Sequence, residues 1–280
     1  MSVPRIKTIV IAMLVLINAF FMALIVIDAV AEAHTERQTL ENVCAIMRKG
    51  GIEVRPDDVG AAGDIRTMRT ARVLEVEEGI ARAFLGPTAM VDQGVIYRYE
   101  NEERGVAEFA SAGDFEIRMK DGVITEGRGL VRTVNGLLRG MKLDTSAPAQ
   151  PVELDSDTVM VTVIGTYRGT GIFNGVIEFI FEGGSLQTVR GRYVAGVEPV
   201  EGGAEISRVE TALLGFLAAV GNDDREYVGC TRIYSVEAGY RQRVSGSFGE
   251  GVITPAWMIT TDNGRFLMDD ATWEIWVFNS

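Results

Sequence analysis

An apolar run at residues 8–27 constrains this chain more than any other feature of its sequence. The run contains no charged side chain, and its only polar residues are Thr8 and Asn18. As a helix that rises about 1.5 Å per residue, it spans roughly 30 Å, which matches the hydrocarbon core of a bilayer. The sequence therefore predicts a single transmembrane helix near the start of the chain.

Charged residues on the two sides of this run predict its orientation. Arg5 and Lys7 precede the run, whereas Asp28, Glu32 and Glu36 follow it. Basic residues beside a membrane segment tend to stay in the cytoplasm. We therefore expect a single-pass protein of the cell membrane, with a cytoplasmic N-terminus and the bulk of the chain outside the cytoplasm.

A cleaved signal peptide is the alternative interpretation of the same segment. Residues 29–31 and 31–33 read Ala-Val-Ala and Ala-Glu-Ala, the small-x-small pattern that signal peptidase accepts. The apolar run is, however, longer than the roughly 7 to 15 residues of an ordinary signal-peptide core. This length favours an uncleaved anchor.

Four residues of the predicted membrane helix indicate contact with a partner helix. Asn18 carries a carboxamide, which in hydrocarbon seeks a hydrogen-bond partner on another helix. Ala12, Ala19 and Ala23 fall within an arc of about 40° on an ideal helix, and small residues permit close helix packing. We predict that these four residues bind a partner; ordinary contact with lipid is the alternative for the alanines.

The overall charge and the cysteines limit the choice of partner and of fold. The formal net charge is −12, and an acidic protein is repelled by nucleic acid and by anionic lipid surfaces. We therefore expect no nucleic-acid partner. Cys44 and Cys230 are too few and too far apart for a disulfide framework. We expect both to be buried and unpaired, with a disulfide between them as the alternative.

Hydrophobic periodicity predicts alternating groups of strands and helices beyond the anchor. Helix-like spacing and capping residues predict helices at 35–49, 76–84, 130–141 and 206–220. Short segments rich in β-formers predict strands at 67–74, 95–99, 106–109, 115–119, 159–166, 172–181, 186–194, 226–236, 240–244, 255–260, 265–268 and 273–278. The Asn263-Gly264 dipeptide predicts a tight hairpin turn.

A weak internal repeat predicts that the outer part is duplicated. A shift of 62 residues aligns 116–129 with 178–191, and a predicted helix follows each segment. The sequence thus predicts an α+β fold, in which the transmembrane helix precedes duplicated units of antiparallel β-meander plus helix. We place the domains at 1–34, 35–150 and 151–280, because the segment around residue 150 is rich in Pro, Ser and Ala.

The sequence contains few of the residue patterns that are typical of catalytic or metal-binding sites. The single histidine, His34, lies beside the predicted membrane surface, so a Ser-His-Asp triad or a histidine-bearing metal site cannot form inside a cleft. Acidic pairs at 57–58, 223–224 and 269–270 lack the spacing of a calcium loop, and we interpret them as solvated turns. We therefore predict no catalytic residue, no metal and no cofactor.

Both ends of the chain resemble one family. The basic start at 5–9, the apolar helix with Asn18, the capped helix after it and the segment Gly-Ile-Glu-Val at 51–54 resemble the head of YycI proteins, which belong with the YycH regulators. Residues 255–272, with a Pro-Ala-Trp strand, an Asn-Gly turn and an Asp-Ala-Thr segment, resemble the closing hairpin of the family. Trp273 stands where the family pattern has glycine.

The resemblance implies a regulator that acts by contact and is not an enzyme. Such a protein has extracytoplasmic α+β domains beside a sensor histidine kinase that controls cell-wall metabolism, and its transmembrane helix takes part in the contact. A YycH-like co-regulator is the second implied partner. An envelope protein that binds a small ligand or polymer between its two outer domains is the alternative, and a secreted hydrolase has almost no support.

Overall fold

A computed structural model of the chain describes residues 13, 18, 20–22, 35–94, 96–110, 113–127, 129–220, 229–244 and 250–278. Helices occupy residues 35–49, Leu74–Leu85 (α2), Leu130–Met141 (α3) and Val209–Val220 (α4), and a 3-10 helix occupies Pro56–Asp58 (η1). The strands are β1 Met68–Thr70, β2 Ala89–Asp92, β3 Ile96–Asn101, β4 Gly105–Ala110, β5 Asp114–Met119, β6 Val152–Glu153, β7 Thr158–Tyr167, β8 Thr170–Glu182, β9 Ser185–Arg192, β10 Glu198–Pro199, β11 Ile233–Val244, β12 Gly251–Thr261, β13 Gly264–Asp269 and β14 Ile275–Val277.

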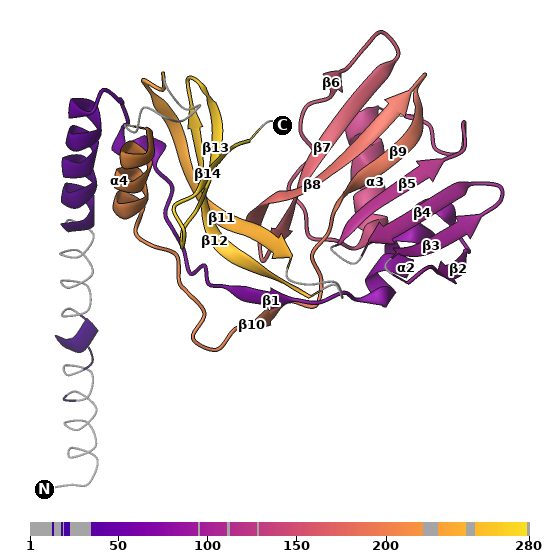
Figure 1. Cartoon of the computed structure of the whole chain (residues 1–280), viewed down its shortest axis with the longest axis horizontal. Helices are drawn as coiled ribbons and strands as arrows, with labels where there is room; N and C mark the ends of the chain where they lie inside the picture. Colours follow the sequence, from indigo (N-terminus) through magenta and orange to yellow (C-terminus); the bar gives the residue numbers. More distant parts are fainter. Residues whose placement is uncertain are drawn as a thin grey trace, which may run out of the picture.

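The strands form one sheet. In the described part of the chain, 14 strands join in a sheet whose main order is β10-β1-β12-β11-β8-β9-β5-β4-β3-β2 (Figure 1). Strands dominate and the helices are few. The predicted α+β fold, with an N-terminal transmembrane helix followed by duplicated units of antiparallel β-meander plus helix, is therefore wrong.

The pairing of β5 with β9 explains why separate duplicated units do not form. These strands are antiparallel neighbours, and Arg190 of β9 lies opposite Glu116 on one side and opposite Glu178 on the other. The Nε of Arg190 donates to Glu178 Oε2 at 2.6 Å. An edge strand exposes unpaired backbone groups, and joining β5 to β9 satisfies those groups. The segments that the repeat matched are thus neighbours in one sheet.

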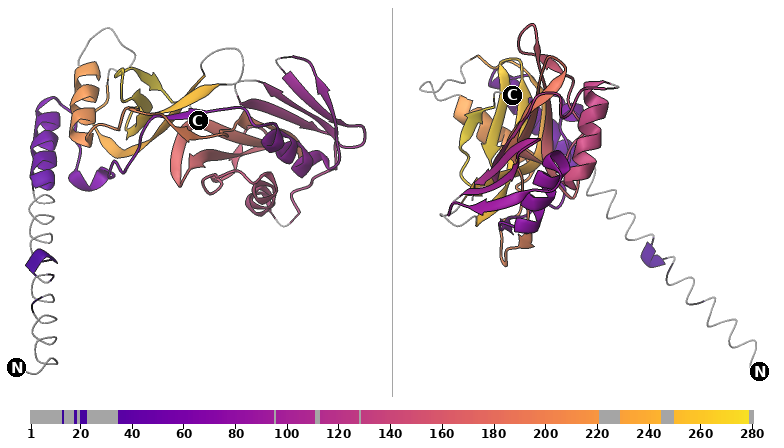
Figure 2. Two further views of the ribbon diagram at one scale, coloured as in Figure 1. Left: turned by 90° about the horizontal axis from the view of Figure 1, so that it is seen from below. Right: turned by 90° about the vertical axis from the view of Figure 1, so that its right-hand side faces the viewer.

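Two hydrophobic clusters lie toward opposite ends of this sheet. In the first cluster, α2 and α3 cover the strands around Phe84, Phe109 and Phe179. In the second cluster, the helix at 35–49 and α4 cover β11, β12 and β13 around Trp257 (Figure 2). The first cluster contains residues from both sides of residue 150, and the predicted division into domains there stays a prediction.

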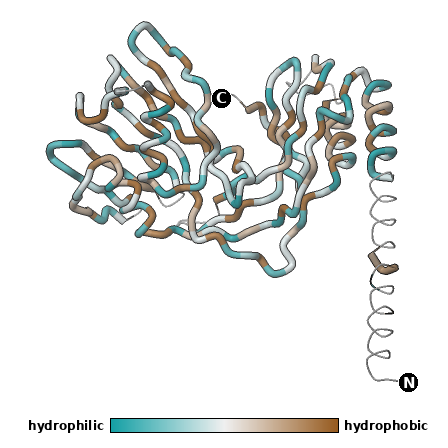
Figure 3. The backbone as a smooth tube through the Cα atoms, turned by 180° about the vertical axis from the view of Figure 1, so that it is seen from behind, coloured by the Kyte–Doolittle hydropathy of each residue, from teal (hydrophilic) through white to brown (hydrophobic). Residues whose placement is uncertain are grey.

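The two ends of the sheet meet at a narrow waist between β8 and β11. The two strands share one parallel pair, Tyr240 opposite Ile172. A Cβ atom at Gly239 would lie 2.5 Å from Phe173 Cζ and 2.6 Å from the carbonyl oxygen of Gly171, so only glycine allows this approach. Buried residues alternate with half-buried ones along most of β8, and Figure 3 shows hydrophobic positions recurring along the strands.

The closing turn after β13 adopts a conformation that favours glycine. Trp273 has φ 59°, and its backbone N–H donates to the carbonyl oxygen of Asp269 at 3.0 Å. A left-handed backbone is costly for a bulky side chain. The tryptophan ring fills the space above α4, since a Cβ atom at Gly215 would lie 2.7 Å from Trp273 Cε3.

Two helix glycines should respond in opposite ways to the same substitution. We expect Gly215→Ala to lower the free energy of unfolding by about 1–3 kcal/mol, because the new methyl group collides with the Trp273 ring. Gly136→Ala in α3 meets nothing within 4 Å and should raise it by about 0.5–1 kcal/mol. Urea denaturation followed by circular dichroism measures the free energy of unfolding of each variant. Stabilisation by Gly215→Ala would contradict the packing of Trp273 on α4.

The predicted membrane helix falls largely outside the described residues. Within 8–27 only residues 13, 18 and 20–22 are described, and they are helical and exposed. Of the helices that the structure describes, none is both long enough and apolar enough to cross a membrane.

Candidate functional site

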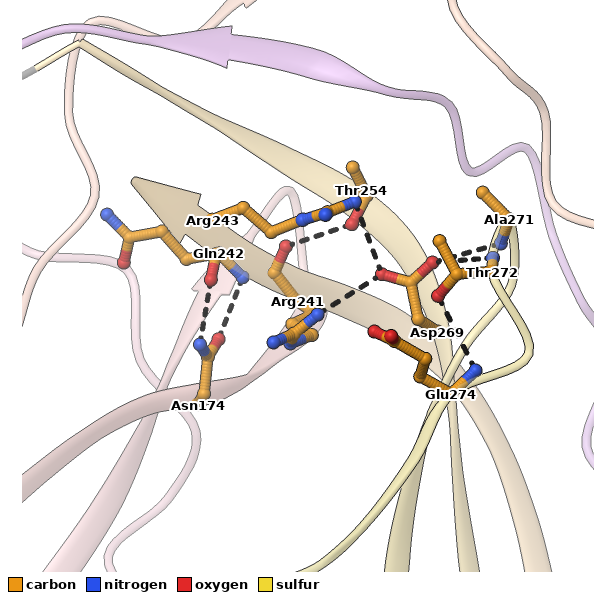
Figure 4. Close-up of polar contacts among 9 residues, drawn as sticks. All are labelled: Asn174, Arg241, Gln242, Arg243, Thr254, Asp269, Ala271, Thr272 and Glu274. Atoms are coloured by element: carbon orange, nitrogen blue, oxygen red, sulfur yellow. Dashed lines mark hydrogen bonds and ion pairs between the residues drawn. The ribbon is translucent and has the colours of Figure 1, made fainter. Parts of the chain in front are cut away.

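Arginine and aspartate side chains gather beside the waist, on β11 and β13 (Figure 4). Asp269 is fully buried, and its Oδ2 lies 3.4 Å from an Nη of Arg241 and 3.9 Å from an Nη of Arg243. Its Oδ1 accepts the backbone N–H groups of Ala271 and Thr272, both at 3.1 Å. A buried carboxylate is costly unless it is paired and hydrogen-bonded. The three hydrogen-bond donors, together with the longer ion pair to Arg243, make Asp269 a link between β11 and the closing turn.

Asp270 ties the segment before α4 to the same hairpin. Its carboxylate accepts the indole Nε1–H of Trp257 at 2.8 Å and the backbone N–H of Ser207 at 2.8 Å. Asp269 and Asp270 are only 0% and 9% exposed, so the interpretation of this pair as a solvated turn is wrong. Of the other acidic pairs, 57–58 lies in η1 and 223–224 lies outside the described residues.

A second buried polar cluster joins α2 to the segment that follows β9. Arg72 makes two hydrogen bonds to Glu77, at 2.7 and 3.0 Å, and the hydroxyl of Tyr193 donates to Glu77 Oε1 at 2.6 Å. The Arg72 guanidinium also lies 4.2 Å from the centroid of the Tyr97 ring. Burial, followed by the hydrogen bond to Glu77, raises the pKa of Tyr193. The sequence pattern does not reveal this cluster, because charged residues are expected at the surface.

A cavity of about 380 Å³ lies between the first hydrophobic cluster and the waist. Apolar side chains from both regions form much of its wall, together with three charged residues. The apolar wall residues are Val76, Leu143, Ile172, Ile177, Val194, Ala195 and Val197, and the charged residues are Lys142, Asp144 and Arg192. Its volume and mixed lining are those of a small-molecule site.

Of the four predicted partner-binding residues, the structure describes only Asn18, which lines neither polar cluster nor the cavity. Asn18 lies in a short described helical piece and is exposed. Ala12, Ala19 and Ala23 lie outside the described residues, as does His34. The role predicted for Asn18 and the three alanines stays a prediction.

Both cysteines lie in the second hydrophobic cluster. Cys44 and Cys230 are 3% and 6% exposed and are unpaired. Burial raises the pKa of each thiol, which disfavours the reactive thiolate. The predicted burial of both residues is confirmed.

Among the residues with described positions, no group of three or more His, Cys, Asp or Glu side chains could hold a metal ion. The carboxylates that are buried, Glu77, Asp269 and Asp270, are each satisfied by protein donors. Their contacts are those of fold-stabilising groups.

Comparison with known proteins gives matches only among solved structures. No protein-family model matches the chain, and no curated protein matches it. Three chains of solved structures match, including the crystal structure of an uncharacterized protein from Eubacterium rectale ATCC 33656. That structure is 7% identical, with a TM-score of 0.47 over 81% of this chain and 92% of the neighbour. At this level of similarity, the function must be argued from the residues of the chain.

Proposed function

We propose that this protein is a membrane-anchored, extracytoplasmic regulator of a two-component sensor histidine kinase that controls cell-wall metabolism. It acts by direct protein contact and carries out no chemistry of its own. The apolar run at 8–27, the basic residues before it and the resemblance of both chain ends to YycI proteins support this proposal. Its partners are the kinase and a YycH-like co-regulator.

The observation that carries the proposal is the packing of the helix at 35–49. Val43, Cys44 and Met47 of this helix are 6%, 3% and 0% exposed, and they belong to the same cluster as α4 and the β11–β13 strands. At the end of the helix, a Cβ atom on Gly50 would lie 2.6 Å from Leu217 Cδ1 of α4. The helix is thus held firmly against the folded part.

Through this packing, a displacement of the apolar run by a bound partner would be transmitted to the sheet. The helix at 35–49 begins shortly after the apolar run at 8–27 ends. A packed helix transmits a displacement because interfaces in protein cores resist continuous deformation. A kinase helix that binds the apolar run would therefore displace the sheet. A displacement of the sheet would in turn shift the kinase helix.

Substitutions in the apolar run should weaken recovery of the kinase. We expect Asn18→Leu to cost about 0.5–1.5 kcal/mol of helix association, a two- to twelvefold loss of complex. Leucine is favoured at the centre of a membrane, so insertion should be unaffected. Replacing Ala19 and Ala23 together by isoleucine should have a larger effect, because it blocks close packing. Co-purification with the kinase in mild detergent measures the loss.

Ile17→Leu, which alters an apolar neighbour of Asn18, is the matched control and should recover as much kinase as the parent. Circular dichroism of each purified variant checks that the folded part is unchanged. If Asn18→Leu and the double isoleucine variant both recover the parental amount of kinase, the apolar run is only an anchor, and the regulatory contact lies in the folded part.

A further inference from the structure

We infer that the cavity between the first hydrophobic cluster and the waist binds a small amphiphile with an apolar body and an anionic head group. This inference does not depend on the proposed contact with a kinase. It rests on how the cavity is held open, on the composition of its wall and on the charges of its lining.

The cavity exists because the packing of β7 and β8 is interrupted. The register between these strands shifts between Ile164 and Thr166, and the residues at the irregularity, Gly165 and Gly175, contribute no side chain to fill the space. A Cβ atom at Gly165 would lie 3.2 Å from the carbonyl oxygen of Gly175. The two backbones therefore approach closely at the irregularity, and both glycines line the cavity beside it.

Polar contacts hold the surrounding wall in place. Arg192 makes two hydrogen bonds to Asp114, at 2.7 and 2.9 Å. The next residue, Tyr193, is fixed through its hydroxyl to Glu77. On the opposite wall, the backbone N–H of Thr166 donates to the carbonyl oxygen of Asp144 at 2.8 Å. A wall fixed in this way lowers the cost of ordering on binding.

The apolar wall belongs to two separate hydrophobic clusters. Val76, Leu143 and Ile177 pack with the first cluster, whereas Ile172 and Val197 pack with a small cluster at the waist that includes Tyr240. An apolar ligand body in this space would contact both clusters. Removing apolar surface from water favours such binding.

The charges of the lining favour an anionic head group. The charged residues of the lining are Lys142, Asp144 and Arg192. Arg192 is already engaged by Asp114. Among the described residues, no carboxylate lies within ion-pair distance of the Lys142 ammonium, which therefore supplies the charge that meets the ligand.

A photoreactive probe tests the site within the full chain. The full chain in lipid nanodiscs is illuminated with decanoic acid that carries a diazirine at its chain end, then digested and analysed by mass spectrometry. We expect crosslinks to concentrate at residues 142–146, 165–167 and 192–197. Excess decanoate should remove these crosslinks, whereas decylamine, with the same body and the opposite charge, should not.

Three variants and a control separate the site from general adsorption. Ala195→Phe and Val76→Phe fill the cavity from different elements and should each abolish the labelling. Lys142→Glu should lower it about three- to tenfold, the effect of losing one partly exposed ion pair and adding a repulsion. Lys49→Glu changes the net charge by the same amount as Lys142→Glu, but at an exposed position outside the cavity. The probe should label this variant to the same extent as the parent.

Several outcomes would overturn the inference. Labelling that is confined to the apolar run at 8–27, or that spreads without preference for the three segments, would show that the cavity does not bind the probe. Equal competition by decylamine and decanoate would refute the anionic head group. Parental labelling of Lys142→Glu and of both filling variants would refute the assignment to this cavity.

Discussion

Replacing Glu77 with alanine is expected to lower the free energy of unfolding by about 3–5 kcal/mol. Glu77 is fully buried, Arg72 beside it is only 12% exposed, and the Tyr193 hydroxyl has Glu77 as its acceptor. Alanine would leave a buried guanidinium without its carboxylate and a buried hydroxyl without an acceptor. Removing one partner of a buried ion pair lowers the free energy of unfolding by far more than the intact pair contributes to it. The reason is that the remaining charge stays buried, out of contact with water.

The neighbouring residue supplies a matched control. Glu78 lies on the same helix, and its carboxylate pairs with Arg82 at the surface. Glu78→Ala should cost no more than about 0.5 kcal/mol, as expected for an exposed i,i+4 pair. Urea denaturation followed by far-UV circular dichroism compares the two variants. Equal costs for Glu77→Ala and Glu78→Ala would contradict the view that this buried cluster stabilises the α2 end of the sheet.

Met47→Ala is expected to lower the free energy of unfolding by about 2–5 kcal/mol. The Met47 side chain is fully buried where the helix at 35–49 packs against the second hydrophobic cluster. Removing it leaves a cavity whose cost depends on how far the surroundings can collapse. Hydrogen exchange should locate the effect, with protection lost at 35–49 and α4 and kept in α2 and α3.

The adjacent residue Ile46 is the control for this variant. Its side chain is 45% exposed, and Ile46→Ala should change stability by well under half the Met47→Ala effect. If hydrogen exchange speeds up equally over α2, α3 and the helix at 35–49, the two ends of the sheet unfold as one unit. If Met47→Ala leaves protection at 35–49 unchanged, this helix is not held by its packing.

Local signals in the sequence predicted most of the individual elements. The periodic apolar residues of α2 and α3 and the Asn263-Gly264 turn between β12 and β13 lie where the sequence predicts them. The sequence predicts two strands, at 226–236 and 240–244, where the structure has the single strand β11, which runs through Gly239. In the structure that glycine permits the approach of β8 at the waist, which is a tertiary requirement that local patterns do not contain.

Local sequence patterns could not predict the order of the strands in the sheet or the burial of the charged residues. β1 pairs with β12, and β5 pairs with β9, and each pairing depends on which distant edge becomes available. Asp269 is buried because Arg241 and Arg243 reach it from β11. Arginines two positions apart on a strand share a face, so this spacing was the one available hint. The cavity likewise arises from strand register.

A short Gly-Ser insertion between residues 34 and 35 would uncouple the apolar run from the packed helix at 35–49. If contact at the apolar run is transmitted to the sheet through this helix, the insertion should abolish regulation of the kinase. Autophosphorylation of the kinase, reconstituted with the full chain in proteoliposomes, is measured with the parent and with the insertion variant. We expect the insertion variant to have the melting temperature of the parent and to co-purify with as much kinase, but no longer to change the autophosphorylation rate of the kinase. A variant that still regulates the kinase to the parental extent would contradict transmission through the helix at 35–49.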